Sequence, residues 1–297
     1  MPPGGPRHGA RYRRRRLYLR RFARNRPALL GVARFVLLVL FSAFGGLFTP
    51  FAYTDVDLRA LTRPPGGTHY YGTNQGGDHV YAEAVHGLQR SLVIAVSVSV
   101  LTIALAAVIG AGAAYFGGRV EKLTLMVIHF LLVVLSFLIL ALVSHHLAGD
   151  WRVLILVLSV FGWISTARVV WSVSTSLRER DYVLAAEFMG VRPRRIVLRH
   201  IISNLGSLLV VNLTLGVVAT VLSENALSFL GFGVQPPDMS LGTMLADGSG
   251  TITSAPWLFG YPAALVVLLT VSVTLIGDGL RDALDPTSVT GAAGGRR

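Results

Sequence analysis

The chain alternates between long apolar segments and shorter polar or charged ones. The apolar segments fall at about residues 28–49, 91–116, 123–144, 153–171, 205–230 and 256–277. Segment 91–116 has no charged residue, and its length is enough for a tilted helix to cross a hydrocarbon layer of ~30 Å. The pattern therefore predicts an all-α integral membrane protein with six transmembrane helices.

The composition agrees with a membrane protein and argues against several other classes. Of the 297 residues, 53% are hydrophobic and 14% are charged, whereas a soluble domain carries roughly a quarter charged residues. The net charge of +12 does not indicate nucleic-acid binding, because the arginines stand at the edges of apolar segments without an aromatic-basic module. The chain has no cysteine, which excludes disulfides and thiolate metal sites.

The sequence also argues against nucleotide binding and catalysis by this chain. The single lysine, Lys122, follows Glu121, so no G-x-x-x-x-G-K-[ST] phosphate loop is present. An H-E-x-x-H helix and a nucleophile elbow are absent as well. We therefore predict that the chain is not an enzyme by itself and carries no cofactor, and that any ATP and Mg²⁺ are bound by partner subunits.

The positive charges are distributed unevenly along the chain. Residues 1–27 form a basic tail with ten arginines and no acidic residue. With six spans, and with Arg34 counted as inside because it stands near the cytoplasmic end of its span, 22 of the 27 arginines and lysines are placed inside, four are outside, and Arg168 lies within a span. This bias predicts that the tail 1–27, the loop 174–204 and the C-terminal tail 287–297 are cytoplasmic. A nucleic-acid arm and a cleaved signal peptide are alternatives for the N-terminal region, although no A-x-A site follows its apolar core.

A charged island, Asp181–Asn204, separates the fourth and fifth apolar segments and reads DYVLAAEFMGVRPRRIVLRHIISN. Gly190 can take a positive φ where one short helix ends, and Pro193 suits the first turn of another. The two adjacent alanines would give the first helix a shallow face that another surface can approach closely. The island therefore predicts two short helices that are joined at a glycine and are open to a partner.

This island resembles the cytoplasmic loop of importer permeases of the ATP-binding cassette (ABC) class. The family pattern is Glu-Ala-Ala, three residues, Gly, nine residues, an apolar position, one residue and Leu-Pro. Leu184 stands here in place of the Glu, and Ser203 in place of the Pro. The blocks GTNQGGDHV and LSFLGFGVQPP resemble the peptide and nickel branch of the same family, and the resemblance covers about residues 24–286.

The resemblance implies a fold, partners and a set of contact residues. It implies a type I ABC importer permease domain over residues 28–286, in a bacterial cytoplasmic membrane, most similar to oligopeptide or dipeptide permeases. Implied partners are a second homologous permease in a heterodimer, two ATP-binding subunits, an extracytoplasmic substrate-binding protein, the peptide and the lipid bilayer. The residues that would couple the chain to the ATPase are Ala185, Ala186, Glu187, Gly190, Val191, Arg194, Arg195, His200 and Asn204.

The polar stretch 50–90 is predicted to be an outer loop, and Tyr81–Gln89 to be a short helix at the membrane surface. Three histidines, His69, His79 and His86, could suggest a metal site. Their separations fit no common ligand spacing on one helix face, so we predict no metal there.

Two stripes of small residues with i, i+4 spacing run along segment 91–116, and we expect them to support helix packing and not to line a pore. They are Ser91, Ala95 and Ser99, and Ala106, Gly110 and Ala114.

Glu224 is the only acidic residue deep in a predicted span. It lies about 29 Å along the helix from Leu205 at ~1.5 Å per residue, which places it near the outer surface. We predict a gating or packing role for Glu224, with a solvated interfacial acid as the alternative. A proton- or sodium-driven transporter would need paired intramembrane carboxylates or matched broken helices, and we see neither. Within the favoured family, nickel import is the alternative to peptide import.

Overall fold

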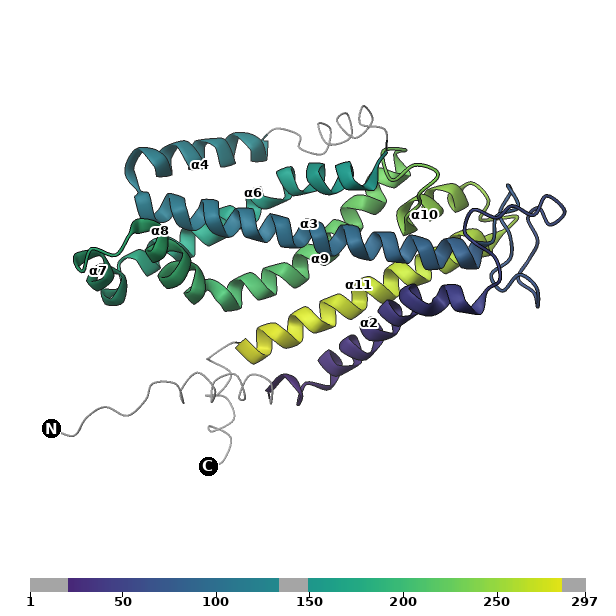
Figure 1. Cartoon of the computed structure of the whole chain (residues 1–297), viewed down its shortest axis with the longest axis horizontal. Helices are drawn as coiled ribbons and strands as arrows, with labels where there is room; N and C mark the ends of the chain where they lie inside the picture. The colour runs from purple at the N-terminus through teal and green to yellow at the C-terminus, as the bar shows by residue number, and fades with distance from the viewer. Residues whose placement is uncertain (1–20, 134–148, 285–297) are drawn as a thin grey trace.

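The structure is a computed structural model that describes residues 21–133 and 149–284 as a bundle of long helices (Figure 1). The long helices are α2 (Arg26–Phe44), α3 (Val80–Phe116), α4 (Gly118–Val133), α6 (Trp151–Arg178), α9 (Gly206–Phe229) and α11 (Pro256–Leu284). The short elements are η1 (Gly45–Phe48), α7 (Asp181–Phe188), α8 (Pro193–Arg195), η2 (Ile196–Ile201), η3 (Ile202–Leu205) and α10 (Leu241–Ser249). The described residues form helices and turns, with two isolated β-bridges in the outer loop.

Five helical stretches in the described part of the chain are long and apolar enough to cross a membrane. They correspond to five of the predicted spans. The third predicted span, 123–144, matches α4 as far as Val133, and its remainder lies outside the described residues. The all-helical membrane fold is therefore confirmed, whereas the number of six spans stays a prediction.

Helix α3 forms the centre of the bundle and packs against both α6 and α9. The prediction of a separate surface helix at Tyr81–Gln89 is wrong, because α3 continues without a break from Val80 to Phe116. The glycine in this stretch, Gly87, does not end the helix. A Cβ at Gly87 would lie 3.2 Å from the carbonyl carbon of Ser240, so the glycine lets the loop before α10 approach α3 closely.

The small-residue stripes of α3 face its neighbours, as predicted for packing, but Ser99 also lines a cavity between α3, α6 and α9, which the prediction did not include. All six residues of the two stripes are buried. A Cβ at Gly110 would lie 2.6 Å from the carbonyl oxygen of Ala167 on α6, so the two helix backbones are nearly in contact there. Such close approach is how helices associate in lipid, where no hydrophobic drive brings them together.

The elements divide between two ends of the bundle (Figure 1). Helices α7 and α8 lie at one end, toward which α2 begins and α11 finishes, and α10 lies toward the other end with the loop 50–79. That the α7 end lies in the cytoplasm, as the arginines indicate, stays a prediction. We refer to the α7 end as the inner end and to the α10 end as the outer end.

Candidate functional site

The charged island folds as a platform, residues 181–205, on the inner ends of α3 and α6. We call it the inner platform. One apolar cluster joins it to these helices, formed by Ala111, Tyr115, Val170, Val183, Ala186, Ile196, Val197, Ile201 and Leu205. The platform is therefore packed against two spans through one shared buried cluster.

The turn between α7 and α8 has the geometry that the sequence predicts. Gly190 has φ +72°, and its N–H donates to the carbonyl of Glu187 at 2.9 Å. The N–H of Val191 donates to the carbonyl of Ala186 at 3.1 Å, so α7 ends in a glycine cap. A Cβ at Gly190 would meet nothing within 4 Å in this chain, so the backbone angle alone is what requires glycine there.

The second half of the platform differs from the prediction. Two separate short helices were expected, but α8 leads through η2 and η3 into α9, and Pro193–Phe229 forms one helical stretch. Ser203 stands here in place of the family proline. Serine has a backbone N–H and no pyrrolidine ring, so it does not obstruct the preceding helical turn as a proline would. Asn204 Nδ2 donates to the carbonyl of His200 at the same junction. A displacement of the platform therefore reaches α9 directly.

One of the two alanines of α7 is buried, although both were expected to be exposed. Ala186 was expected on an open face, but it is 2% exposed and packs into the chain's own cluster, because it lies one turn from Val183 on the same face. Ala185 and Glu187 are exposed. Two large apolar side chains at the end of α7 are also open, Phe188 at 89% and Met189 at 75% exposure.

A basic rim continues from this apolar tip. Arg192, Arg194, Arg195 and Arg199 are exposed, and none of them forms a salt bridge within the described residues. His200 is half-buried. The inner platform thus presents two bare apolar side chains beside unpaired positive charges, a combination that suits an apolar cleft with an acidic border.

A cavity of about 230 Å³ lies at mid-length between α3, α6 and α9. Its lining has no charged residue, and six hydroxyl side chains and one amide supply its polar groups: Ser99, Thr102, Ser165, Thr166, Thr220, Ser223 and Asn212. Thr102 Oγ1 is buried without a hydrogen-bond partner. The site can therefore exchange hydrogen bonds with a polar molecule without selecting its charge.

Glu224 is buried at 1% exposure, so the alternative of a solvated interfacial acid is wrong. Its Oε1 accepts hydrogen bonds from Ser228 Oγ at 2.8 Å and from Ser240 Oγ. Ser240 is the N-cap of α10, and its hydroxyl also accepts from the N–H of Thr243. Glu224 therefore fixes the start of α10 to the outer part of α9, while its Oε2 has no partner in the described chain.

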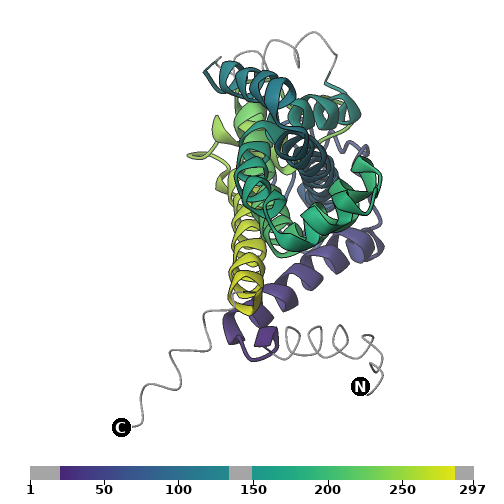
Figure 2. The ribbon, with the colours of Figure 1, turned by 90° about the vertical axis from the view of Figure 1, so that its left-hand side faces the viewer.

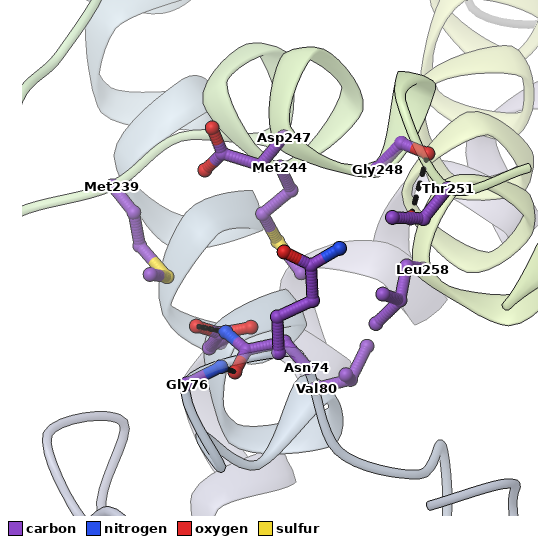
Figure 3. A pocket seen from close by; sticks show the side chains of 11 residues that line it. Asn74, Gly76, Val80, Met239, Met244, Asp247, Gly248, Thr251 and Leu258 are labelled. Atoms are coloured by element: carbon purple, nitrogen blue, oxygen red, sulfur yellow. Dashed lines mark hydrogen bonds between the residues drawn. The ribbon is translucent and has the colours of Figure 1, made fainter. Parts of the chain in front are cut away.

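An outer cavity of about 280 Å³ separates the outer loop from α10 (Figure 3). Asn74 lies on the loop side, where its Nδ2 donates to Glu83 Oε1 at 3.1 Å and to Asp78 Oδ2 at 2.8 Å. Asp247 of α10 lines the other side, and burial raises the pKa of its carboxyl group. The cavity thus carries two carboxyl groups among apolar and amide side chains.

The three histidines of the outer region separate into two groups. His69 Nδ1 and His79 Nδ1 lie 3.1 Å apart, and the ring of Phe51 stacks on His79 with a centroid distance of 3.8 Å. His86 Nε2 lies 2.9 Å from Asp238 Oδ1, which also accepts from Arg90 Nε at 2.9 Å. Within the described ranges, no three His, Cys, Asp or Glu side chains form a group that could hold a metal ion.

Sequence reasoning missed the exposed apolar tip and the mid-length cavity. Phe188 and Met189 directly precede the glycine of a loop predicted to lie in water, and that position was a usable signal. The lining of the cavity comes from three helices that are distant in sequence, so no local pattern reveals it. Of the two buried partners of Glu224, Ser228 stands one turn further along α9, whereas Ser240 belongs to the start of α10.

These features define a polytopic helical membrane component with a polar site between its spans and an inner surface open to a partner. A family model for the binding-protein-dependent transport system inner membrane component matches residues 102–289. A second model, for the N-terminal transmembrane domain of oligopeptide transport permease C, matches residues 14–65. The chain belongs to the family of binding-protein-dependent transport system inner membrane components.

Curated relatives match over nearly the whole chain. The oligopeptide transport system permease protein OppC of Mycobacterium tuberculosis is 44% identical over 277 residues, 93% of this chain and 95% of that protein. OppC of Bacillus subtilis is 32% identical and covers 90% of this chain and 87% of its own length. The dipeptide transport system permease protein DppC of Bacillus subtilis is also 32% identical, with coverage of 90% and 84%. The relatives are named permeases, in agreement with the prediction that this chain is not itself an enzyme.

Proposed function

We propose that this chain is one of two permease subunits of an ATP-driven importer of oligopeptides in the bacterial cytoplasmic membrane. Family membership supports dependence on an extracytoplasmic binding protein. The names of the relatives favour an oligopeptide or dipeptide cargo over nickel. In this proposal a second, homologous permease completes the path, and two separate subunits bind ATP and Mg²⁺.

The inner platform is the proposed contact with the ATPase subunits. The observation that carries this assignment is the bare pair Phe188 and Met189 at the tip of α7, at the end of the bundle that we place in the cytoplasm. Large apolar side chains lose favourable burial when they stay in water, at about 25 cal/mol per Å² of apolar surface. A cleft on the ATPase would cover them, and its acidic groups would pair with Arg194 and Arg195.

The residues predicted to couple to the ATPase divide into two roles in this proposal. Those that can touch the ATPase are exposed: Ala185, Glu187, Gly190, Arg194, Arg195 and Asn204. Ala186, Val191 and His200 act from within the platform, because they are buried or half-buried against it.

The helical stretch Pro193–Phe229 is the proposed link between ATP hydrolysis and the path. Its inner end belongs to the platform, its middle lines the mid-length cavity, and its outer part carries Glu224. ATP can change the conformation of this chain only through contacts that differ between the two states. A platform displaced by the ATPase would tilt α9, change the cavity and move α10 through Glu224, which gives this residue a combined gating and packing role.

The mid-length cavity is the proposed contribution of this chain to the translocation path. A peptide backbone offers one donor and one acceptor at each non-proline residue, and hydroxyl groups can satisfy either. The uncharged lining suits cargo whose side chains vary. The outer cavity with Glu83 and Asp247 faces the side from which the binding protein would deliver the peptide.

The proposal is tested with the complete importer in proteoliposomes. Phe188→Ser should release the ATPase subunits or abolish the stimulation of ATP hydrolysis by peptide-loaded binding protein, with peptide uptake reduced at least tenfold. Leu184→Ala changes a residue of the same helix that is 39% exposed, and it should have a smaller effect. Full assembly and uptake with Phe188→Ser would contradict the docking assignment, and uptake of nickel instead of peptide would contradict the cargo.

A further inference from the structure

Arg34 lies in an unusual place for a charged side chain. It stands on α2 about 12 Å beyond Arg26 at ~1.5 Å per residue, inside the first membrane span. Arg34 is exposed at the surface of the bundle and forms no salt bridge with any residue that the structure describes. A charge inside the hydrocarbon layer is costly unless it finds a partner or reaches the interface.

A groove of about 290 Å³ begins at Arg34 and is lined by residues of α2 and α11 together with Tyr71. Figure 2 shows that α2 and α11 lie at one edge of the bundle. Apart from Arg34 its lining is apolar or aromatic: Leu37, Leu38, Phe41, Tyr71, Leu265 and Leu268. On the inner side of Arg34 the two helices touch. A Cβ at Gly31 would lie 2.8 Å from the carbonyl oxygen of Ser272. The groove is therefore closed toward the cytoplasmic end and opens just beyond the guanidinium group.

We propose that this groove binds an anionic phospholipid of the inner leaflet, with its phosphate on Arg34 and one acyl chain along the groove. The guanidinium group is a bidentate donor for phosphate, and its apolar stem lets it extend toward the headgroups. The apolar walls match an acyl chain, and lipid is the solvent that reaches this edge of a membrane protein. The basic tail 1–27 is predicted to lie on the cytoplasmic side, where anionic lipids give the membrane a negative surface potential.

The chain offers a matched control for this site. Arg168 of α6 is also an exposed arginine within a span, but it lines no part of the groove. Leu37→Trp provides a second kind of change, because it fills the groove and leaves Arg34 in place. The N-terminal tail is unchanged in all of these variants, so any lipid that the tail attracts contributes equally to each.

The test is native mass spectrometry of the complete delipidated importer with equal amounts of phosphatidylglycerol and phosphatidylcholine of identical acyl chains. Arg34→Gln should reduce the preference for phosphatidylglycerol about tenfold, the effect of losing one charge-assisted contact. Arg168→Gln should leave this preference unchanged, and Leu37→Trp should lower the binding of both lipids.

Equal preference in Arg34→Gln and Arg168→Gln would overturn the proposal, as would a wild-type importer without preference. A photoreactive residue at Leu268 distinguishes the remaining occupants. In native membranes it should crosslink to lipid, whereas a crosslink to the second permease or to another protein would show that protein covers the groove and would also overturn the proposal.

Discussion

The inner and outer ends of this protein are held together by different interactions. The inner platform is fixed by an apolar cluster, and its arginines are left without partners in the described chain. The outer end has a buried apolar cluster as well, which includes Val80, Leu241 and Leu258, but it adds polar contacts that the inner platform lacks. These are Glu224 with two serines, Asn74 with two carboxyl groups, and Asp238 with His86 and Arg90. An apolar contact depends on shape, whereas the polar contacts also depend on protonation. We therefore expect the outer end to respond to pH more strongly than the inner platform.

The largest stability effect is expected at Glu224. Glu224→Leu should destabilise the protein by about 2–4 kcal/mol, because the hydroxyl groups of Ser228 and Ser240 lose their acceptor in a buried site. Glu224→Gln keeps one acceptor oxygen and should cost less. Thermal unfolding of the purified importer measures both changes. Transport by Glu224→Gln that had lost a dependence on a proton gradient would contradict the packing role and revive an ion-coupled mechanism.

The next effect concerns shape at the inner end. Ala186→Leu should destabilise the platform by about 1–3 kcal/mol, because the added side chain overfills the cluster. Ala185→Leu, the same change one residue earlier on the exposed face, should stay within about 0.5 kcal/mol. Protease sensitivity of residues 181–205 and thermal unfolding compare the pair. Equal effects would show that the platform is not packed as described.

A smaller effect is expected from a change of pH, which should destabilise the outer loop 50–79 more than the inner platform. Burial lowers the pKa of His79, and the nearby His69 lowers it further, against Asp57, Asp55 and Asp78, which raise it. Because the pKa of His79 is lower in the folded loop than its ordinary value of 6.5, His79 contributes fully to the stability of the loop when the pH is above 6.5. This contribution is lost as the pH falls below that value.

The hydrogen-exchange protection of residues 50–79, corrected for the pH dependence of intrinsic amide exchange, should therefore fall between pH 7.5 and 5.5, with little change in residues 181–205. His79→Gln should remove most of this pH dependence. An identical response at both ends would contradict the contrast between them.

The smallest effect is expected at the ion pair of Arg90 and Asp238. Burial opposes ionisation of Asp238, but hydrogen bonds from His86 and Arg90 outweigh it and lower its pKa. The pair is partly exposed to solvent, at 27% and 23% of the side chains. Arg90→Gln should therefore cost about 0–1 kcal/mol in thermal unfolding, and the cost should shrink at high salt. A loss as large as that of Glu224→Leu would show that this contact is a main support of the outer end.

Much of the fold could be predicted from the sequence, because the spans of a membrane protein are long apolar segments that can be recognised directly. The charge-free segment 91–116 and the arginine bias needed no tertiary information. Gly190 was predictable too, since few residues besides glycine end a helix at positive φ. The role of Ala186 was not, because helical spacing does not tell which face meets the chain's own core. The continuity of Pro193–Phe229 was also missed, since the charged residues up to Asn204 were assigned to a short helix separate from the span 205–230.

The central claim is that the inner platform couples this chain to ATP hydrolysis, and two glycines allow a direct test. Gly190 at the inner end and Gly231 at the outer end have φ of +72° and +79°, and a Cβ at either position would meet nothing within 4 Å. Substitution by valine therefore imposes similar backbone strain at both sites.

The decisive measurement is peptide-stimulated ATP hydrolysis by the complete importer in proteoliposomes. With Gly190→Val, we predict that the ATPase subunits detach or hydrolyse ATP without responding to loaded binding protein, while Gly231→Val keeps most of the response. Full stimulation and full transport with Gly190→Val would contradict the account. Equal losses in the two variants would also contradict it, because backbone strain alone would then explain the result.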